Sequence, residues 1–389
     1  MASNIYDVIV VGGGPAGSSC ATVCAHQGMK TLLIDRDTFP RSKPCGGAIS
    51  EQALSYLDFV LPEEIIEKEC YGARIHFKGY HVEVRKDYRL AVLVSREKFD
   101  NFLLVKTLET GAHILQGQKV IGLRIYRDHV DVTTENESFR ASYVVGADGV
   151  NSYIATHVRP PLQNKEKLFA IVSEIQAPNE VIDRRLDRII DIYFGLVPLG
   201  YGWVFPHSNY YSLGVGGRAT EFQHPRKVLS DFGESVGLTI TSSQGHFIPI
   251  GGIRRKMAIH RILLVGDAAG LADPFIGEGI AYAIRSGKLA ALTIADSLKK
   301  GILPDKATAA YESACKQFIV REISFSWKMT KIIYQFPDLF LRLFASDKRI
   351  LQKYLEIPSC RIHYRNFLLW LITRLPLYSC AIRLQRRFH

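Results

Sequence analysis

The chain has 389 residues, of which 47% are hydrophobic, and it carries a formal net charge of +11 at pH 7. This length suits two interleaved domains, and the apolar content is that of a globular protein with a sizeable core. No uncharged apolar stretch approaches the roughly 20 residues of a membrane-spanning helix, and the N-terminus lacks the basic start of a signal peptide. We therefore expect a cytoplasmic protein, either free or peripheral on the cytoplasmic face of a membrane.

The first predicted element is a strand that runs into a glycine-rich turn and then a helix. The apolar run Val8–Val11 precedes the turn and Ser18–Ala25 has helical potential. The glycines between them have G-x-G-x-x-G spacing: Gly12, Gly14 and Gly17. Glycine allows a tight turn, close approach of a pyrophosphate and close helix–strand packing. A second strand, Thr31–Ile34, ends in Asp35, which suits ribose hydroxyls. The pattern predicts dinucleotide binding; the alternative is a tight turn without a ligand.

The following loop, residues 36–48, is rich in proline and glycine. It contains Lys43-Pro44-Cys45-Gly46-Gly47, a candidate wall of an active site. Its cysteine, Cys45, is either inert or functional. The seven cysteines have no zinc-like spacing, so we expect free thiols and no metal site. A helix is predicted from Ile49 to Tyr56.

The next segment predicts strands, a helix and then a meander. Three strands are expected first: Ala73–Phe77, Tyr80–Val84 and Ala91–Val94. Ser95 is a suitable N-cap for a helix that runs to about Thr110. Strands between Lys119 and Val145 deliver Gly146-Ala147-Asp148-Gly149. This turn brings backbone close to a ligand and predicts a second part of the nucleotide site.

A later strand carries large aromatic rings at alternate positions. Tyr201, Trp203 and Phe205 are spaced by two, so all three rings face one side of a strand. Such a face is either core or the wall of an apolar pocket. Gly214 and Gly216 follow on another strand, where they leave backbone bare toward a neighbour or a ligand.

A third glycine-rich turn precedes a long predicted helix. The apolar strand Arg261–Val265 runs into Gly266-Asp267-Ala268-Ala269-Gly270, and Gly277 and Gly279 open a helix over Ile280–Lys299. The positive end of the helix dipole suits an anionic group, phosphate or reduced flavin. The chain after Pro304 is predicted to be mostly helical.

The C-terminal region is basic. Residues 321–389 contain 13 Lys or Arg and 4 Asp or Glu, and hence +9 of the net +11. The apolar run Phe367–Ile372 lies between Arg365 and Arg374, and further arginines follow: Arg383, Arg386 and Arg387. Such a segment fits docking on anionic lipid, and the alternative is a helix packed on the core. The tail also suits an acidic electron carrier, whereas no reader motif for nucleic acid is present.

Four of these motifs, in this order, resemble the FAD-dependent oxidoreductases of the p-hydroxybenzoate hydroxylase structural class: the glycine turn with Asp35, Ser95-Arg96, Gly146–Gly149 and Gly266–Gly270. Three others are similar to those of the geranylgeranyl reductase family: Lys43–Gly47, Tyr201-x-Trp203-x-Phe205-Pro206 with Gly214-x-Gly216 seven residues later, and Pro274-x-x-Gly277-Glu278-Gly279-Ile280. The resemblance covers roughly residues 5–300. It departs where Asp35 replaces the usual Glu, where Asp273 replaces the common Asn, and at Tyr153–Ala155, which lacks the family's Arg.

The resemblance implies an α/β fold in which a Rossmann-type FAD-binding domain is interleaved with an antiparallel β-sheet substrate domain. The FAD-binding domain would comprise residues 1–55, 95–160 and 250–303. The substrate domain would comprise residues 56–94 and 161–249. Residues 304–389 would form a helical, basic region that either faces a membrane or packs on the core.

The resemblance also implies a function: reduction of isolated C=C bonds in a geranylgeranyl or polyprenyl chain by hydride from N5 of the reduced flavin. The substrate would be a prenyl lipid, a chlorophyll precursor or a prenyl quinone. NAD(P)H or reduced ferredoxin would supply electrons. The rivals are a flavin-dependent monooxygenase or halogenase of the same class, and an electron-relay flavoprotein.

The site residues follow from the same resemblance. FAD is expected on Gly12, Gly14, Pro15, Ala16, Gly17, Asp35, Arg36, Cys45, Gly46, Gly47, Ala48, Arg96, Val120, Asp148, Gly266, Asp267, Pro274, Gly277, Gly279 and Ile280. The substrate is expected on Tyr201, Trp203, Phe205, Pro206, Gly214 and Gly216. The residues expected at the reacting centre are Cys45, Tyr201 and Trp203. The proton donor is left open, with Cys45 shaping the pocket and water as the proton source.

Overall fold

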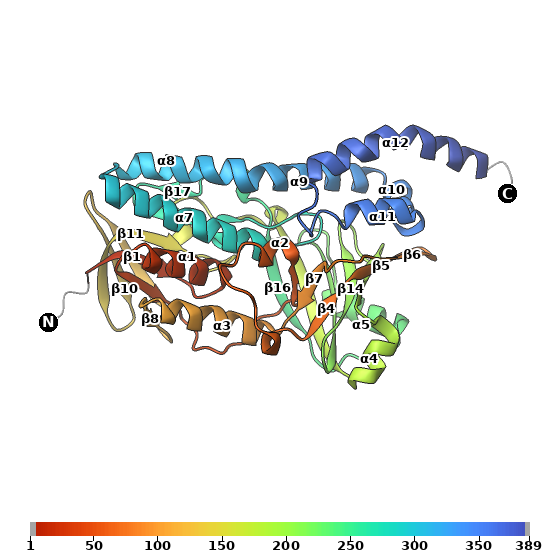
Figure 1. The fold of residues 1–389 in the computed structure, drawn as a ribbon, viewed down its shortest axis with the longest axis horizontal. Coiled ribbons are helices and arrows are strands. Elements are labelled where there is room, and N and C mark those ends of the chain that lie inside the picture. Colours follow the sequence, from red (N-terminus) through yellow and green to blue (C-terminus); the bar gives the residue numbers. More distant parts are fainter. Residues whose placement is uncertain (1–4, 386–389) are drawn as a thin grey trace.

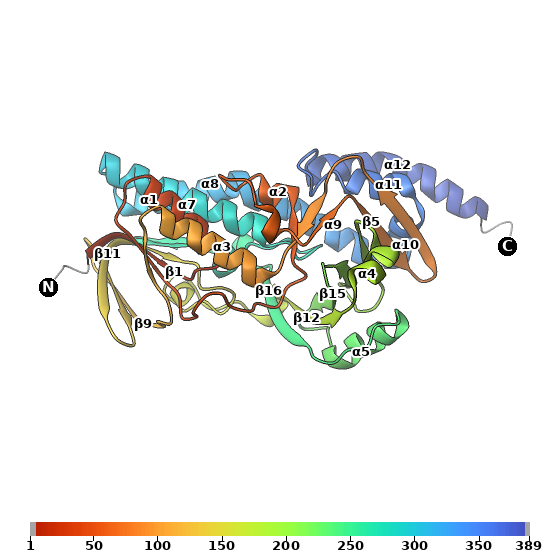
Figure 2. The same ribbon diagram turned by 60° about the horizontal axis from the view of Figure 1, so that its bottom comes forward.

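The structure is a computed structural model that describes residues 5–385, with side chains described up to residue 374. The molecule is elongated, with one large β-sheet toward each end and a row of helices along one side (Figures 1 and 2). The α/β prediction is confirmed, with a Rossmann-like sheet, a mainly antiparallel sheet and C-terminal helices.

The first sheet has eight strands in the order β17-β18-β11-β1-β2-β8, and β10 and β9 extend it from β11. Its strands are β1 Ile5–Val11, β2 Thr31–Ile34, β8 His113–Leu115, β9 Val120–Ile125, β10 Val130–Thr134, β11 Ser138–Gly146, β17 Ala258–Ile259 and β18 Ile262–Leu264. The central strands β18, β11, β1, β2 and β8 are parallel. The apolar residues of β2 and β18 and of the C-terminal halves of β1 and β11 are buried, which is typical of a parallel sheet that is covered on both faces.

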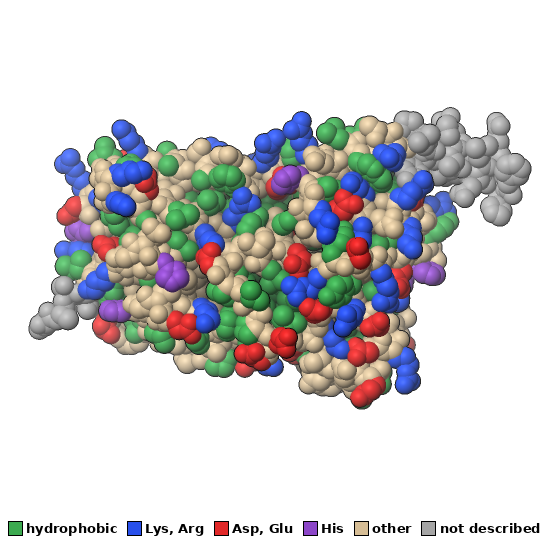
Figure 3. Space-filling model, viewed as in Figure 1, with side chains coloured by type: hydrophobic (Ala, Val, Ile, Leu, Met, Phe, Trp, Pro, Cys, Tyr) green, Lys and Arg blue, Asp and Glu red, His purple; other side chains and the backbone are tan. Residues whose placement is uncertain are grey.

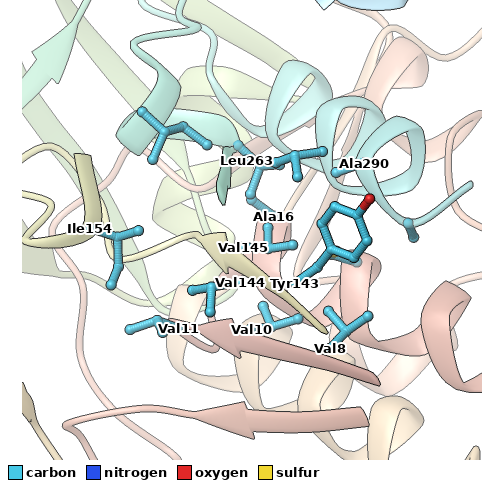
Figure 4. Close-up of a cluster of buried hydrophobic side chains, with 14 of the residues drawn as sticks. Val8, Val10, Val11, Ala16, Tyr143, Val144, Val145, Ile154, Leu263 and Ala290 are labelled. Atoms are coloured by element: carbon cyan, nitrogen blue, oxygen red, sulfur yellow. The ribbon is translucent and has the colours of Figure 1, made fainter. Parts of the chain in front are cut away.

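Helices cover this first sheet and fix its packing. They are α1 Pro15–His26, α3 Arg96–Glu109, α7 Ile280–Lys300 and α8 Pro304–Cys315. Figure 4 shows Val10 and Val145 of neighbouring strands beside Leu263, with Ala290 of α7 near them. The helices α1 and α7 lie so close that a Cβ on Gly287 would be 2.3 Å from the carbonyl oxygen of Ala16.

The second sheet has seven strands in the order β16-β12-β15-β14-β13-β5-β6, and all its pairs are antiparallel except β13 with β5. Its strands are β5 Gly72–Phe77, β6 Tyr80–Arg85, β12 Lys167–Gln176, β13 Ile189–Phe194, β14 Tyr201–Pro206, β15 Tyr210–Arg218 and β16 Gln244–Pro249. One face packs against α4 Asn179–Leu186 and α5 Pro225–Ser235. The other face borders the site described below, and at β5 and β6 it packs against C-terminal helices.

Short elements connect the two sheets. A three-stranded sheet contains β3 Ala48–Ser50, β4 Lys68–Cys70 and β7 Ala91–Leu93. The small helices are α2 Glu51–Leu54 and α6 Gly266–Ala269, with 3₁₀ turns at Glu63–Ile65, Ile154–His157, Asn164–Glu166 and Gly252–Arg254.

One local prediction is wrong. The helix expected over Ile49–Tyr56 is a strand followed by the short α2, because Ile49 pairs with Val92 of β7 and is fully buried there. Ser95 is the N-cap residue of α3, as predicted, although its hydroxyl makes no capping bond. A side-chain cap does form on α2, where the Ser50 hydroxyl accepts a hydrogen bond from the Ala53 amide.

The remaining helices wrap the end of the molecule that holds the second sheet (Figure 1). A π-helical turn, Lys316–Val320, joins α8 to α9 Arg321–Gln335, and α10 Pro337–Ser346, α11 Lys348–Tyr354 and α12 Tyr364–Gln385 follow. Both α10 and α11 contact β6. Phe344, Tyr354 and Phe367 bring α10, α11 and α12 into one buried cluster. Among residues 5–385, no helix combines the length and apolarity needed to cross a membrane.

Candidate active site

The three glycine-rich turns meet at one edge of the first sheet. In the register of the parallel strands, Val11 lies beside Gly146 and Ile34, and Gly146 lies beside Leu264. The turns that follow these strands therefore converge. A Cβ on Gly12, whose φ is +108°, would be 2.3 Å from the carbonyl oxygen of Ala147, so only glycine fits this approach.

A cavity of about 340 Å³ begins at this edge and reaches across to the second sheet. The predicted residues on its wall are Gly14, Pro15, Ala16, Cys45, Gly46, Gly47, Ala48, Arg96, Asp267, Pro274, Gly277, Gly279, Ile280, Tyr201, Trp203, Phe205 and Gly216. Residues more than 250 positions apart in the sequence thus share one space. This is the site that the separate motifs form together.

The nucleotide end of this space fits a dinucleotide with a pyrophosphate. A Cβ on Gly14 would meet only Arg41, at 3.8 Å, and a Cβ on Gly149 would have no atom within 4 Å. The backbone there is bare and open, as a phosphate cradle requires. The Arg41 guanidinium, which the sequence did not single out, adds positive charge beside Gly14.

Buried charges fix the side chains around the cradle. Arg96 is 8% exposed and donates from Nε and Nη2 to both carboxylate oxygens of Asp100, at 2.9 and 2.8 Å. Asp100 also pairs with Arg41, at 3.2 Å. Arg41 also lies 3.6 Å from a carboxylate oxygen of Asp37. The two guanidinium groups are thus held by two carboxylates, and Arg96 lines the cavity.

Asp267, at the third turn, has basic neighbours from two other elements. Its Oδ2 lies 3.7 Å from Nζ of Lys43 and 4.0 Å from Nε2 of His246. Burial raises the pKa of Asp267, but the charge of Lys43 and the interaction with His246 outweigh this and hold the pKa below its ordinary value. Asp267 is thus an ionised acceptor at neutral pH, which suits hydroxyl groups of a ligand.

Seven predicted cofactor residues do not line the cavity, and four of them are not turn glycines. Asp35 accepts hydrogen bonds from the amides of Gly13 and Asp37, which supports the turn itself. Asp148 turns its carboxylate to Ser152 and to the amide of Ile154, so the backbone beside Asp148 faces the cavity. Arg36 is exposed and near Asp37, and Val120 is buried on β9.

The turn glycines Gly12, Gly17 and Gly266 shape the backbone and lie behind the cavity wall. A Cβ on Gly17 would overlap the carbonyl oxygen of Gly12, and a Cβ on Gly266 would be 2.9 Å from Cβ of Ala16. Their role in the structure is close packing of the three turns.

The aromatic strand forms a wall of the cavity. Adjacent ring centroids of Tyr201, Trp203 and Phe205 are 6.1 Å apart, and all three rings face the same space. The Tyr201 hydroxyl donates to the carbonyl oxygen of Ile276, which ties β14 to the loop before α7. The three rings thus line the cavity, and Trp203 and Phe205 also pack in a buried cluster with Leu93 and Val172.

The two alternate glycines differ in role. Gly216 lies on the cavity wall, and a Cβ there would meet Cβ of Ala170 at an ordinary 3.5 Å. Gly214 lies beneath the indole of Trp203, where a Cβ would be 2.1 Å from the ring. Pro206 ends β14 opposite Tyr211 and is outside the cavity wall.

The Cys45 loop is held from behind by a buried pair. His207 is 1% exposed, and its ring nitrogens lie 2.5 Å from a carboxylate oxygen of Glu67 and 3.1 Å from the carbonyl oxygen of Gly46. The amide of Gly47 donates to Sγ of Cys45, at 3.4 Å. Cys45 is half-buried and lines the cavity. The His207–Glu67 support could not be predicted from the sequence, because neither residue belongs to a recognised motif.

The far part of the cavity is apolar, and sequence reasoning missed most of it. Strands β5 and β13 contribute Ala73, Ile75, Ile190, Ile192 and Phe194, and the C-terminal helices and the loop after them contribute Phe344, Leu351, Tyr354, Leu355 and Pro358. The C-terminal region, which was expected to be helical and basic but was not assigned to the site, thus lines the cavity. Its contribution depends on tertiary packing, for which helical periodicity alone gives no signal.

Comparison with known proteins agrees with this geometry. Residues 5–209 match the family model described as FAD binding domain. A geranylgeranyl diphosphate reductase of Rhodobacter capsulatus is 35% identical over 314 residues, which cover 76% of each chain. An uncharacterized protein of Methanosarcina barkeri is 32% identical over 335 residues, 85% of this chain and 84% of that one.

Solved structures share the fold. A geranylgeranyl bacteriochlorophyll reductase-like protein of Thermoplasma acidophilum has a TM-score of 0.81 at 23% identity, covering 97% of this chain and 98% of that chain. A flavin-dependent brominase has a TM-score of 0.73 at 17% identity, covering 99% of this chain and all of that chain. At these identities the likeness concerns the fold alone.

The fold, the converging glycine turns and the matched domain define an FAD-dependent oxidoreductase. The chain belongs to the geranylgeranyl reductase family of FAD-binding proteins, whose enzymes act on CH–CH groups.

Proposed function

We propose that this protein hydrogenates isolated C=C bonds of a geranylgeranyl or related polyprenyl chain. The observation that carries the proposal is the single cavity that joins the dinucleotide edge to an apolar chamber between the second sheet and the C-terminal helices. A digeranylgeranylglycerophospholipid reductase of Methanocaldococcus jannaschii, 28% identical over 86% of this chain, supports the substrate class.

The chamber suits a prenyl tail because such a tail offers nothing to hydrogen-bond. Its binding energy comes from burial of apolar surface, at about 25 cal/mol per Å². The rings of Tyr201, Trp203 and Phe205 supply one wall, and aliphatic side chains of β5 and β13 continue it. A reductase that recognises only the shape and the apolar surface of the prenyl chain can accept a prenyl lipid, a chlorophyll precursor or a prenyl quinone.

The chain's own groups would hold FAD along the nucleotide end. Gly12, Gly14 and the start of α1 would take the pyrophosphate, Arg96 would offset its charge, and Asp267 would accept from the ribityl hydroxyls. When bound and reduced, the flavin supplies a hydride from N5. The start of α7, at Gly279 and Ile280, presents the positive end of a 21-residue helix and would stabilise negative charge there.

NAD(P)H or a reduced ferredoxin would provide the electrons. The sequence contains one strand–glycine turn–helix unit of the G-x-G-x-x-G type, so NAD(P)H would dock transiently beside the FAD. The basic residues of the C-terminal region would receive an acidic carrier protein.

The direct test is a single turnover without oxygen. FAD-loaded protein is reduced with dithionite and incubated with geranylgeranyl diphosphate or a geranylgeranyl glycerolipid. The molecular masses of the products are measured by mass spectrometry. We expect the gain of one or more hydrogen pairs. A parallel incubation contains oxygen, NAD(P)H, halide and an aromatic acceptor. If no prenyl substrate gains hydrogen in the first experiment and the acceptor gains oxygen or halide in the second, the monooxygenase or halogenase rival is correct.

We also propose that α12 docks on an anionic membrane surface, where prenyl lipids reside. Phe367 and Leu371 are buried against the core, whereas Leu369 and Ile372 are 54% and 53% exposed. The helix thus packs on the core with one face and offers apolar side chains on another. Lys and Arg side chains are frequent on this end of the molecule (Figure 3). The arginines expected to assist, Arg383, Arg386 and Arg387, lie outside the residues whose side chains are described.

Removal of α12 would expose the buried cluster, so substitution is the better test. The variant L369S/I372S should bind vesicles that contain phosphatidylglycerol at least several-fold more weakly than the parent, with unchanged FAD content. The control is Leu292→Ser, because Leu292 is 48% exposed on α7. Equal vesicle binding by all three proteins would end the membrane proposal.

A further inference from the structure

Hydrogenation of a C=C bond needs a proton as well as a hydride, and few groups on the cavity wall can donate one. The hydroxyl of Tyr201 is committed to the carbonyl oxygen of Ile276. Burial raises the pKa of Cys70 to about 12, and burial also raises the pKa of Tyr354 well above its ordinary value. None of these groups is a ready acid at neutral pH.

The basic groups at the nucleotide end each lie near a carboxylate. The Arg96 guanidinium is held by Asp100, and Lys43 and His246 lie against Asp267. One further acidic side chain, that of Glu278, lines the cavity. The mechanism described so far makes no use of it.

We propose that Glu278 is the proton donor of the reduction and delivers the proton on its Oε2 atom to one carbon of the C=C bond. The inference rests on the proposed function above. Glu278 comes directly before the first residues of α7, between Gly277 and Gly279, and all three line the cavity. It is half-buried, and its accessible part faces the cavity.

The loop that carries Glu278 is held in one position by Asp273. The amide of Asp273 donates to the carbonyl oxygen of Glu278, at 2.8 Å, and the amide of Gly277 donates to the carbonyl oxygen of Asp273, at 2.9 Å. Oδ1 of Asp273 in turn accepts from the amide of Phe275 and from the hydroxyl of Ser326, both at 2.7 Å. This closed turn fixes the direction of the Glu278 side chain.

One oxygen of the Glu278 carboxyl group is already assigned. The Ser50 hydroxyl donates its only proton to Oε1 of Glu278, while its oxygen accepts from the amide of Ala53. Oε1 is therefore the acceptor oxygen, and an acid proton belongs on Oε2. Within the described part of the chain, Oε2 has no hydrogen-bond partner, so its proton is available to the cavity.

The surroundings favour the protonated acid. Burial is the largest cause that raises the pKa of Glu278 to about 7; Ser50 opposes the rise, and the charge of Asp273 adds to it. The charge of Glu278 raises the pKa values of Tyr201, Tyr282, Tyr354 and Cys360, and none of these side chains carries positive charge. An ordinary glutamate, with a pKa of about 4.3, would be almost fully ionised at pH 7.

The step balances as follows. The π electron pair of the C=C bond forms a C–H bond with the Oε2 proton at one carbon, and the hydride forms the C–H bond at the other. The bond broken on the protein is O–H, which leaves a carboxylate. Water that enters the open nucleotide end returns a proton to Glu278 before the next turnover.

The test compares FAD-loaded wild type with Glu278→Gln. Glutamine keeps the acceptor for Ser50 and the size of the side chain, but it has no acidic proton. General acid catalysis contributes about 10²–10⁴-fold, so we expect the single-turnover rate to fall by that factor with unchanged FAD content and Tm. The matched control Glu135→Gln, at an exposed position outside the cavity wall, should retain the rate, and Cys45→Ala tests the thiol as the rival donor.

The pH dependence gives a second arm. The acid form is the active one, so the wild-type rate should fall as pH rises through about 7. Ser50→Ala removes a contact that lowers the pKa of Glu278, so the fall should move to higher pH. Infrared spectra of the protein without substrate should show a protonated carboxyl band that titrates over the same range and is absent from Glu278→Gln.

The outcomes separate the two proposals. A wild type that reduces no prenyl substrate overturns the proposed function. A wild type that reduces the chain, with Glu278→Gln equally fast and with the same pH profile, overturns the role of Glu278. Loss of the rate in Cys45→Ala alone would also overturn it and assign the proton to the thiol.

Discussion

Substitution of Gly216 tests whether the substrate tail crosses β15. This glycine is on the cavity wall and has an extended backbone, and a Cβ there meets Ala170 at a comfortable 3.5 Å. Gly216→Val therefore fits the strand, which β-branched residues favour, and fills part of the chamber. The perturbation acts on the space for substrate and leaves the nucleotide end unchanged.

The magnitude follows from the atoms that valine adds. Its three side-chain carbons displace a similar amount of prenyl chain from the wall, and each lost methylene costs about 0.8 kcal/mol. The total of about 2.4 kcal/mol corresponds to roughly 50-fold weaker binding. Gly216→Ala adds one carbon and should weaken binding roughly 4-fold.

The assay is calorimetric binding of geranylgeranyl diphosphate to the oxidised, FAD-loaded protein. FAD content and Tm of the two variants serve as controls and should match those of wild type. A graded loss from wild type to Ala to Val supports the route across β15. If Gly216→Val binds as tightly as wild type, the tail lies elsewhere and the reasoning is refuted.

Two further predictions concern the nucleotide end and the helix packing. Lys43→Met removes the ion pair with Asp267 and should lower the free energy of unfolding at pH 7 by about 1 kcal/mol. Because the pKa of Asp267 is depressed, the difference in stability between wild type and variant, measured by thermal unfolding, should narrow as pH falls below about 4. A difference that stays constant with pH would contradict the pairing. Gly287→Ala places a Cβ 2.3 Å from the carbonyl oxygen of Ala16 and should destabilise the protein by about 1–3 kcal/mol. An unchanged urea midpoint would show that α1 and α7 can move apart at no cost in stability.

The parts of the site that the sequence predicted are those built from local backbone. The glycine turns are recognisable because φ and close approach demand glycine at fixed spacing, as at Gly12. The shared face of Tyr201, Trp203 and Phe205 follows from the two-residue period of a strand. Parallel pairing then brings the turns to one edge, which the resemblance also implied.

The parts that the sequence did not predict depend on distances between remote elements. Gly214 and Gly216 look alike in the sequence, and only the position of the Trp203 ring separates a supporting glycine from an open one. Glu278 belongs to a predicted helix start, but the direction of its side chain depends on the turn around Asp273. The helix expected at Ile49 failed because pairing with β7 outweighed local propensity.

The wall that α10 and α11 give to the cavity has a consequence for synthesis. Both sheets are complete by residue 264, whereas Phe344 and Tyr354 leave the ribosome some 80 to 90 residues later. The strands and turns of the nucleotide edge are thus synthesised before the helices α10 and α11 that cover the apolar chamber. During that interval the uncovered strands β5 and β13 would be the surface most in need of a chaperone.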